Sequence, residues 1–153
     1  METSCLNHDL QCWFEFNKLT LNSEKTLSST MSLRNHSLND DHVETVKFLG
    51  VHIDSTLNWD EHINHASKSL TKIIYVLRNL RSFVSQKVLL TSYHAYFHSR
   101  LTYAILAWGH SPHMARLFAL QRRCVRYIAN LRYRDSCREE FAKLDIMTFF
   151  ECG

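Results

Sequence analysis

The most regular hydrophobic pattern in the chain follows Asn58. Hydrophobic residues recur there at spacings of three and four and share one face of a helix that turns about 100° per residue; they are Ile63, Ala66, Leu70, Ile73, Ile74, Leu77 and Leu80. Lys68 and Lys72 fall on the opposite face. Asn58 and Glu61 have the spacing of a capping box, in which both side chains satisfy free N–H groups at a helix start. We therefore expect a long amphipathic helix that begins at Asn58.

The next hydrophobic segment, residues 85–108, predicts a second helix. It begins with a serine suited to cap a helix and ends before Gly109, because glycine is the preferred residue just past a helix end. The segment is hydrophobic on nearly all sides, so we expect the central and most buried helix. We expect its tyrosines, Tyr93, Tyr96 and Tyr103, to be core aromatic residues and not platforms for stacked bases.

Two further helices are expected after Ser111–Pro112, a hydroxyl cap followed by proline in the first turn. One half of the helical wheel is hydrophobic and comprises Met114, Leu117, Leu120, Cys124, Val125 and Ile128. The other half carries Arg116, Arg122, Arg123 and Arg126. A second capping box, Ser136 with Glu139, predicts a short helix that ends near Leu144.

The first 57 residues mix helical and strand patterns. Hydrophobic spacing predicts a helix over 5–17, a Ser/Thr-rich alternating segment predicts a strand over 25–33, and VETVKFLGVHI predicts a strand or hairpin arm over 43–53. Alternation along that arm places Leu49, Val51 and Ile53 on one face and Val46 and Phe48 on the other. Since both faces are hydrophobic, we expect both to be covered.

These elements predict an α+β, mostly helical chain. Residues 1–57 form the mixed segment, 58–144 form a bundle of about four helices, and 145–153 form a short tail. Three glycines and one proline in 153 residues also favour long helices over many tight turns.

Composition narrows the class of protein. The start METSCLNHDLQCW lacks the pattern of a signal peptide, and no hydrophobic run approaches the ~20 residues that span a bilayer, so we expect an intracellular, soluble protein without a membrane partner. Five irregularly spaced cysteines favour reduced thiols. Cys5, His8 and Cys12 share a helix face, and His94 and His98 are four residues apart, but neither group has a fourth ligand at a zinc-site spacing. No metal site is therefore expected.

Charge divides the chain. Residues 1–46 hold three Lys/Arg and seven Asp/Glu, a net charge of −4, whereas residues 68–143 hold fourteen Lys/Arg and three Asp/Glu, a net charge of +11. A basic segment of this size attracts polyanions, chiefly nucleic acid. Phosphate contacts carry no base information, so we expect weak binding without sequence preference. The expected contact residues are Lys68, Lys72, Arg116, Arg122, Arg123 and Arg126.

Two segments resemble consecutive motifs of one enzyme family, the reverse transcriptases of non-LTR (LINE-type, jockey-like) retrotransposons. CWFEFNKLTLNSEKT resembles the segment after the catalytic strand, a tryptophan-bearing helix followed by N-x-L-x-L-N-x-x-K-T; its matching residues are Trp13, Asn17, Leu19, Leu21, Asn22, Lys25 and Thr26. KFLGVHIDSTLNWDEHI is similar to the next motif, F-L-G-V-x-I-D followed by L-x-W-x-x-H-I; its matching residues are Phe48, Leu49, Gly50, Val51, Ile53, Asp54, Leu57, Trp59, His62 and Ile63. YVLRNLR, LTYAILAWG, QRRCVRYI and SCREEFAKLDI also look like the family's following region, so the resemblance covers essentially the whole chain in order.

The resemblance implies a position within a polymerase. In that family the F-L-G-V hairpin is the primer grip, which holds the 3′ end of the growing strand, and the following helices form the thumb over the template–primer duplex. Residues 1–57 are then expected to be the end of the palm and 58–144 the thumb, with Phe48, Leu49 and Gly50 against the nucleic acid. An RNA–DNA hybrid or DNA duplex is the implied partner, and no small-molecule substrate is expected.

The same resemblance places the catalytic aspartates of the family before Trp13, and polymerase chemistry needs two metal ions held by such carboxylates. Asp40 and Asp41 are adjacent but lie in a polar stretch that we interpret as a solvated turn. Lys25 matches the lysine implied to protonate pyrophosphate, yet a general acid without a neighbouring metal site does no work. We therefore expect a reverse transcriptase fragment that is inactive on its own and binds no cofactor, Mg²⁺ belonging to the missing part of the palm.

Three other functions stay open. The main alternative is a domesticated helical module that docks another protein or the missing palm and has no nucleic-acid role, because an incomplete sheet leaves an unpaired edge. An active polymerase or nuclease would show magnesium-dependent nucleotide incorporation. A decayed genomic copy without a selected role has the same sequence features as the fragment. The tail LDIMTFFECG, with Phe149 and Phe150, predicts an unfinished element.

Overall fold

The computed structural model describes residues 2–22, 24, 26, 29, 31 and 45–148, within two compact units, Met1–Thr30 and Met31–Gly153. The first unit contains α1 (Glu2–Phe16), which confirms the helix expected over 5–17. Past its end, the side-chain amide of Asn17 donates a hydrogen bond of 2.8 Å to the carbonyl oxygen of Trp13. The strand expected over 25–33 lies mostly outside the described residues.

The second unit contains an antiparallel hairpin of β1 (Thr45–Phe48) and β2 (Val51–Asp54). Its register pairs Thr45 with Asp54, Val46 with Ile53, Lys47 with His52 and Phe48 with Val51. Directly paired residues of an antiparallel sheet share a face. One face of the hairpin is therefore hydrophobic and the other is polar.

The expectation of two hydrophobic faces is wrong. It follows from treating residues 43–53 as one continuous strand, in which Val46 and Ile53 point to opposite faces. The chain instead reverses at Leu49 and Gly50, and this reversal brings Val46 and Ile53 together on one face. The expected coverage is also wrong, since Phe48 on that face is 62% exposed.

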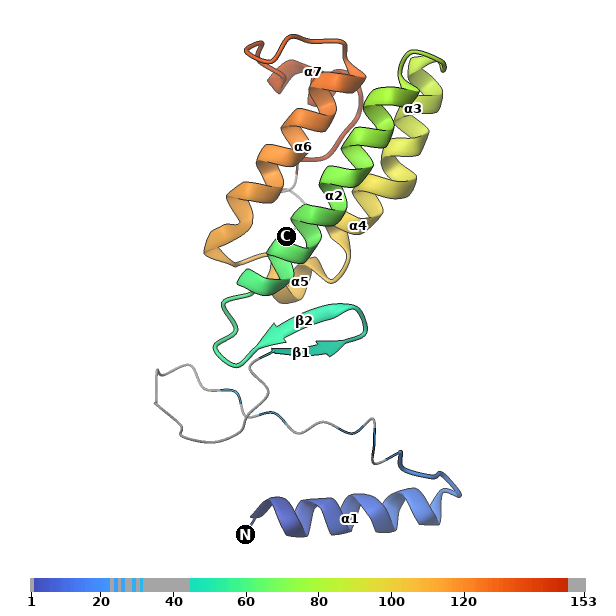
Figure 1. Ribbon diagram of the computed structural model, residues 1–153, viewed down its shortest axis with the longest axis vertical. Helices are drawn as coiled ribbons and strands as arrows, with labels where there is room; N and C mark the ends of the chain where they lie inside the picture. Colours follow the sequence, from blue (N-terminus) through green and yellow to red (C-terminus); the bar gives the residue numbers. More distant parts are fainter. Residues whose placement is uncertain are drawn as a thin grey trace. The chain divides into compact units, whose positions relative to one another are not determined.

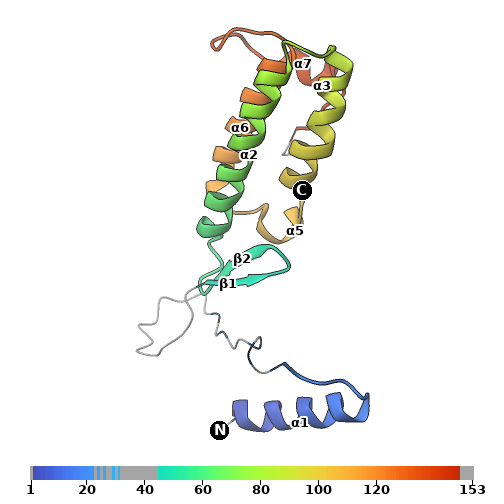
Figure 2. The ribbon, with the colours of Figure 1, turned by 45° about the vertical axis from the view of Figure 1, so that its right-hand side comes forward.

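The central element of the second unit is α2 (Asp60–Leu80). It packs against α6 (Ala115–Ile128) and against α3 (Gln86–Ser92) and α4 (Ser99–Thr102), and β2 packs near its start (Figures 1 and 2). Its predicted stripe is confirmed, with Ile63, Leu70, Ile74 and Leu77 buried and Ala66, Ile73 and Leu80 partly buried against them. Lys68 and Lys72 are exposed, as predicted.

The segment expected as one helix over 85–108 is interrupted. It consists of α3, a π-helical segment η2 (Tyr93–His98), α4 and α5 (Ile105–Trp108). Between α4 and α5 the backbone breaks at Tyr103 and Ala104, and Ala104 has a left-handed φ of 53°. The indole N–H of Trp108 donates to the carbonyl oxygen of Tyr103 at 2.9 Å and stabilises the break. The expectation of a continuous helix is therefore wrong.

This interrupted segment is also not buried on all sides. Its buried residues form one stripe, namely Leu89, Tyr93, Phe97, Leu101, Ile105 and Trp108. The core position expected of Tyr93 is confirmed. Tyr96 and Tyr103 are exposed, and Leu106 is 82% exposed, so the expectation of core positions for the two tyrosines is wrong. Only the side that faces α2 and α6 is covered.

The start expected at Ser111–Pro112 is confirmed, with a 3-10 turn, η3 (Pro112–Met114), leading into α6. The hydroxyl oxygen of Ser111 accepts a hydrogen bond from the backbone N–H of His113 at 3.3 Å, as a cap does.

The short last helix is confirmed as α7 (Arg138–Lys143), but the expected capping box is wrong, because the cap position is Cys137 and no side chain caps the helix there. The Ser136 hydroxyl accepts from the backbone N–H of Arg138 at 3.4 Å. Glu139 instead lies 3.8 Å from the Lys143 ammonium, an i,i+4 ion pair that replaces the expected cap.

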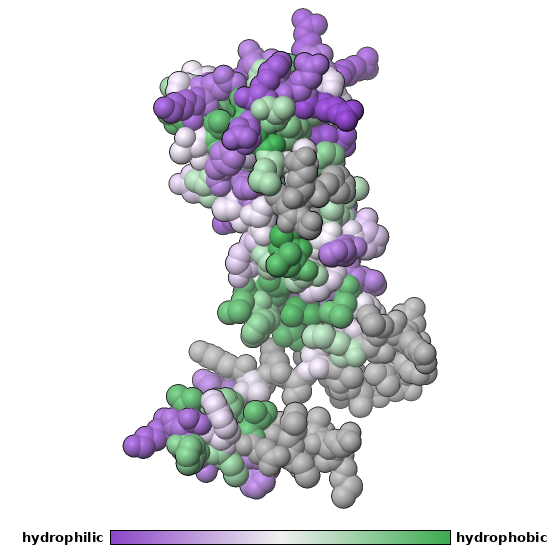
Figure 3. Space-filling model, turned by 180° about the vertical axis from the view of Figure 1, so that it is seen from behind, coloured by the Kyte–Doolittle hydropathy of each residue, from purple (hydrophilic) through white to green (hydrophobic). Residues whose placement is uncertain are grey.

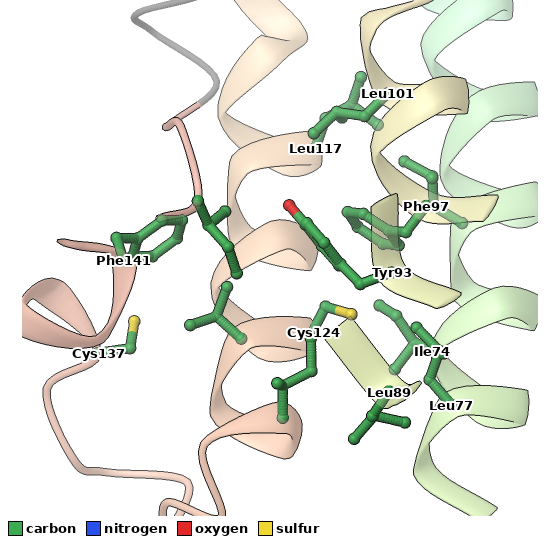
Figure 4. Packing of buried hydrophobic residues seen from close by; sticks show 14 of the residues in the cluster. Ile74, Leu77, Leu89, Tyr93, Phe97, Leu101, Leu117, Cys124, Cys137 and Phe141 are labelled. Carbon is green, nitrogen blue, oxygen red and sulfur yellow. The ribbon is translucent and has the colours of Figure 1, made fainter. Parts of the chain in front are cut away.

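One hydrophobic core joins these helices. Tyr93 and Phe97 point toward α6, which contributes Leu117 and Cys124 (Figure 4). Burial raises the pKa of the Cys124 thiol to about 12, so this cysteine is a packing residue and not a nucleophile. The fully buried Gln121 donates from Nε2 to the Tyr93 hydroxyl at 3.1 Å and to the Met147 carbonyl oxygen at 3.0 Å. The segment after α7 is thereby fastened to the core.

The fold is thus mostly helical with a small antiparallel sheet, which agrees with the predicted α+β class. Within the described residues, no helix combines the length and the hydrophobicity needed to cross a bilayer.

Candidate nucleic-acid interface

The junction between the hairpin and α2 is organised by the carboxylate of Asp54. Its Oδ1 accepts hydrogen bonds from the Thr56 backbone N–H at 3.1 Å, the Thr56 hydroxyl at 3.0 Å and the Asn58 N–H at 2.9 Å. Its Oδ2 accepts from the Trp59 N–H at 2.7 Å. Trp59 has a left-handed φ of 64°, which a bulky residue adopts only where neighbouring contacts hold it. Asp54 supplies those contacts.

The capping box expected of Asn58 and Glu61 is therefore wrong. The cap position of α2 is Trp59, and no side chain caps the helix there. The N–H of Asn58 already binds Asp54, and its carbonyl oxygen accepts from the Ser111 hydroxyl at 3.0 Å. The junction is thereby tied to the start of η3.

The hydrogen bonds at Asp54 also set its charge. Burial tends to raise the pKa of this carboxyl, but hydrogen bonds from Asn58, Thr56 and Trp59 together outweigh burial and lower the pKa below its ordinary value. Asp54 is therefore ionised at neutral pH and acts as a charged acceptor for the junction.

The hairpin turn presents an exposed hydrophobic edge. Phe48 is 62% and Leu49 is 74% exposed, and Gly50 is exposed beside them. Leu49 and Gly50 have φ of 47° and 83°, both left-handed, as a two-residue type I′ turn requires. The Tyr103 hydroxyl donates to the Leu49 carbonyl oxygen at 2.6 Å and holds this turn. The three residues expected against the nucleic acid therefore lie together at an exposed tip.

A groove of about 400 Å³ lies between the hairpin, α2 and α4, and is called the basic groove below. The polar residues that line it are Lys47, His62, His65, Ser69, Ser99, Arg100 and Tyr103, with Gly50 at the hairpin end. Lys47 comes from the polar face of the hairpin, and Arg100 comes from α4. No carboxylate belongs to the described lining, so the groove favours anions.

Three imidazoles gather where the hairpin meets α2. The backbone N–H of His52 donates to Nδ1 of His62 at 3.4 Å, and the ring centroids of His52 and His65 are 4.7 Å apart. Burial, followed by the nearby His52, lowers the pKa of both His62 and His65. Both imidazoles are therefore biased toward their neutral form in the free protein.

A second groove, of about 270 Å³, adjoins the first and is called the hydrophobic groove below. The two share Ser69 and Arg100, whose guanidinium donates to the Ser69 hydroxyl. The rest of the lining is largely hydrophobic and consists of Ile73, Val76, Leu77, Leu80, Ser92 and Tyr96, with Lys72 among them. Lys72, a predicted contact residue, therefore lies beside the basic groove, whereas Lys68 is exposed on α2 without lining either space.

The arginines predicted on α6 lie on its outer half, as the wheel indicates, but they face different neighbours. Arg116 donates to Asn64 Oδ1 of α2 at 2.6 Å, and the Arg122 guanidinium lies 4.9 Å from the Phe118 ring centroid. Arg123 donates to the Tyr127 hydroxyl at 3.3 Å. Arg126 donates to the Asp135 carbonyl oxygen at 3.0 Å. Arg116 therefore lies on the α2 side. Arg122 lies on the α7 side, because Phe118 contacts Phe141.

The surface of the second unit differs between its ends. Figure 3 shows hydrophilic residues gathered at the end that carries α7, where Arg132, Arg134 and Arg138 are exposed. Hydrophobic residues are exposed toward α5 and the hairpin, among them Leu106 and Leu49. The basic groove lies toward this second end, because the hairpin contributes to its lining.

Sequence patterns missed Lys47, His65, Arg100 and Tyr103 as groove residues. Two signals were present. Arg100 is the single charged residue in the long hydrophobic stretch 88–108, and Lys47 is the one cation within the hairpin motif. Their convergence depends on the packing of β1 and α4 around α2, which no local pattern contains.

Lys25, Asp40 and Asp41 lie outside the described residues, as do Phe149 and Phe150. In the described part of the chain, no group of three or more His, Cys, Asp or Glu is arranged to hold a metal ion. Comparisons with models of known protein families, with curated proteins and with solved structures found no match to this chain.

Proposed function

We propose that the chain is the late palm and thumb of a retrotransposon-type RNA-directed DNA polymerase, and that its role is to hold template–primer nucleic acid. The ordered family-like motifs support this assignment. Under it, the hairpin grips the primer and α2, α4 and α6 belong to the thumb. The same resemblance places the catalytic aspartates before Trp13, so we assign grip and not bond formation to these residues.

The observation that carries the proposal is the basic groove beside an exposed hydrophobic hairpin tip. Lys47 and Arg100, which are far apart in sequence, line one space whose described lining contains no carboxylate. Cationic donors bind phosphate diesters through charge-assisted hydrogen bonds. Phe48 and Leu49 offer apolar surface next to those donors, which suits the sugars and bases of a strand end.

A salt titration tests the proposal. Binding of a fluorescein-labelled RNA–DNA hybrid is followed by fluorescence anisotropy between about 50 and about 300 mM KCl, since phosphate contacts release counterions and weaken as salt rises. The expected result is binding that weakens steeply with salt and does not depend on base sequence. Absence of binding at the lowest salt, or binding indifferent to salt, would contradict the proposal.

A matched pair of double variants locates the contact. Lys47→Ala with Arg100→Ala removes two cations of the basic groove, and Lys87→Ala with Arg138→Ala removes two exposed cations elsewhere. Removing two phosphate contacts lowers the slope of log K against log salt by about 2. We expect that loss for the groove pair and a much smaller one for the control pair. Equal losses would assign the binding to overall charge and not to the groove.

A protein-interaction module without a nucleic-acid role is the second candidate. Large hydrophobic side chains that are mostly exposed favour it, namely Leu106 on α5 and Phe48 and Leu49 at the hairpin turn. Under this alternative, the protein self-associates or docks a protein partner, and Leu106→Ser weakens that association. Sedimentation velocity at high concentration measures it, and a monodisperse monomer counts against self-association.

A further inference from the structure

The hairpin rests on α2 through the imidazole cluster of His52, His62 and His65. His62 is buried and fixed, because its Nδ1 accepts the His52 backbone N–H at 3.4 Å and its ring lies 5.3 Å from the Trp108 ring centroid. His65 is one turn further along α2 and is exposed, and it lines the basic groove. His62 also lines the groove but is held by these contacts, whereas His65 is exposed to the space available to a ligand.

The charges around His65 come from every element that surrounds it. Lys47 belongs to β1, His52 to β2, Glu61, His62 and Lys68 to α2, and Arg100 to α4, with Tyr103 following α4. Burial and then the charges of His52 and Lys47 lower the pKa of His65, and Glu61 opposes them only in part. In the free protein, a proton on His65 is therefore disfavoured by burial and by neighbouring positive charge that Glu61 offsets only in part.

We infer that the basic groove binds a phosphate group of the nucleic acid between Lys47, His65 and Arg100, and that His65 takes up one proton from solvent as the phosphate binds. This inference rests on the proposed function and adds its regulation by pH. A phosphate in the groove offsets the repulsion from Lys47 and offers the imidazolium an acceptor. Protonated His65 then donates an N–H to a phosphate oxygen, and no other covalent change occurs.

The sign of the pH dependence follows from linkage. The pKa of His65 is higher in the complex than in the free protein, so binding consumes protons at every pH between the two values. Affinity therefore rises as pH falls through that interval and is constant on either side of it. One exposed ion pair contributes only about a two- to fivefold change in affinity. The expected change in Kd is of that size.

The experiment measures Kd for the labelled RNA–DNA hybrid from about pH 8 to about pH 5.5 at fixed ionic strength, the range in which histidine changes charge. The wild-type chain is compared with His65→Gln and with the control His110→Gln, an exposed histidine outside the groove. We expect wild type and the control to bind about threefold tighter at the acid end, as one exposed ion pair predicts, and His65→Gln to lose most of this change. The quantity compared is the ratio of Kd at the two ends of the pH range within each chain, so a loss of affinity in His65→Gln that does not depend on pH does not enter the comparison.

A second readout uses the wild-type chain alone. The imidazole proton resonance assigned to His65, by its absence from the His65→Gln spectrum, is titrated with and without unlabelled hybrid. We expect its pKa to rise on binding. Binding with a flat pH profile, an unchanged His65 pKa or an undiminished profile in His65→Gln overturns the proton uptake and leaves the proposed function standing. Absence of binding at any pH overturns both.

Discussion

The hydroxyl of Tyr103 donates a hydrogen bond of 2.6 Å to the carbonyl oxygen of Leu49, across 54 residues of sequence. The bond joins the hairpin turn to the break between α4 and α5. Each end contains a non-glycine residue in the left-handed region, Leu49 at φ 47° and Ala104 at φ 53°. Such conformations persist where surrounding contacts hold them. The hairpin and the broken helix therefore stabilise each other, and the basic groove lies between them.

Replacing Tyr103 with phenylalanine removes this bond and keeps the ring. We expect Tyr103→Phe to lower the free energy of unfolding by about 1 kcal/mol, the usual net value of one hydrogen bond. For a chain of this size, the melting temperature then falls by about 2–4 °C. Thermal unfolding followed by circular dichroism measures it. Tyr133→Phe is the matched control, since Tyr133 is 84% exposed, and an equal shift in both variants would contradict the role of the bond.

Leucine is conformationally unfavourable at position 49, so we expect its replacement to change stability and nucleic-acid binding in opposite directions. Asparagine tolerates a left-handed φ, whereas leucine there costs about 1 kcal/mol or more. We therefore expect Leu49→Asn to raise the melting temperature. If Leu49 contacts nucleic acid as proposed, the same variant binds the RNA–DNA hybrid less tightly. A fall in melting temperature would contradict the conformational argument, and unchanged affinity would remove Leu49 from the interface.

The Asp54 carboxylate accepts the hydrogen bonds that hold the junction between the hairpin and α2, and Asp54→Asn tests that role. The carboxylate accepts with both oxygens, and an amide has only one acceptor, so the variant leaves part of the Asn58 and Trp59 contacts unmade. Loss of charge-assisted bonds at a partly buried site is expected to cost about 2 kcal/mol. Chemical denaturation at neutral pH measures the loss.

The dependence of folding stability on pH gives an independent check of the role of Asp54. Its folded-state pKa is lower than the ordinary 3.8, so the unfolded chain binds more protons in acid. Asp54 therefore stabilises the fold fully above pH 3.8, and this stabilisation is lost as pH falls from 3.8 through the folded-state pKa. In Asp54→Asn that acid step is expected to shrink. A wild-type step retained in the variant would assign acid sensitivity to other carboxyls.

Sequence periodicity predicts helices well where the local pattern and the packing agree. The stripe from Ile63 to Leu80 is such a case, because a single face of α2 meets all its neighbours. The start of the same helix was mispredicted, since Asn58 matches a capping pattern but Asp54, four residues earlier, already holds its N–H. Capping patterns describe only the residues of the helix itself, and a side chain from the preceding strand can displace them.

The break at Tyr103 and Ala104 could not be predicted from hydrophobicity. Neither residue is a helix breaker, and hydrophobic residues recur along the whole of residues 85–108. The break is held by two side-chain hydrogen bonds. The Tyr103 hydroxyl donates to the carbonyl of Leu49, 54 residues away, and the Trp108 indole of α5 donates to the Tyr103 carbonyl. The basic groove escaped prediction for the same reason, because Lys47, His65 and Arg100 come from three separate elements. The count of charged residues pointed instead to the arginines of α6, none of which lines the basic groove.

Protonation of His62 is expected to weaken the docking of the hairpin on α2 in mild acid. Burial, then the charges of His52 and His65, lower its pKa below the ordinary 6.5, so the unfolded chain binds more protons and stability falls as pH drops below 6.5. Protonated Nδ1 also cannot accept the His52 N–H. We expect His62→Gln, whose amide oxygen keeps an acceptor without titrating, to weaken the dependence of melting temperature on pH between about 7.5 and about 5.5, where histidine titrates. Hydrogen exchange at the His52 amide, divided by the intrinsic exchange rate at each pH, supplies the local readout as a protection factor. This protection factor should fall below pH 6.5 in wild type and in the control His113→Gln, but less in His62→Gln. An equal fall in all three chains would show that another group governs the docking.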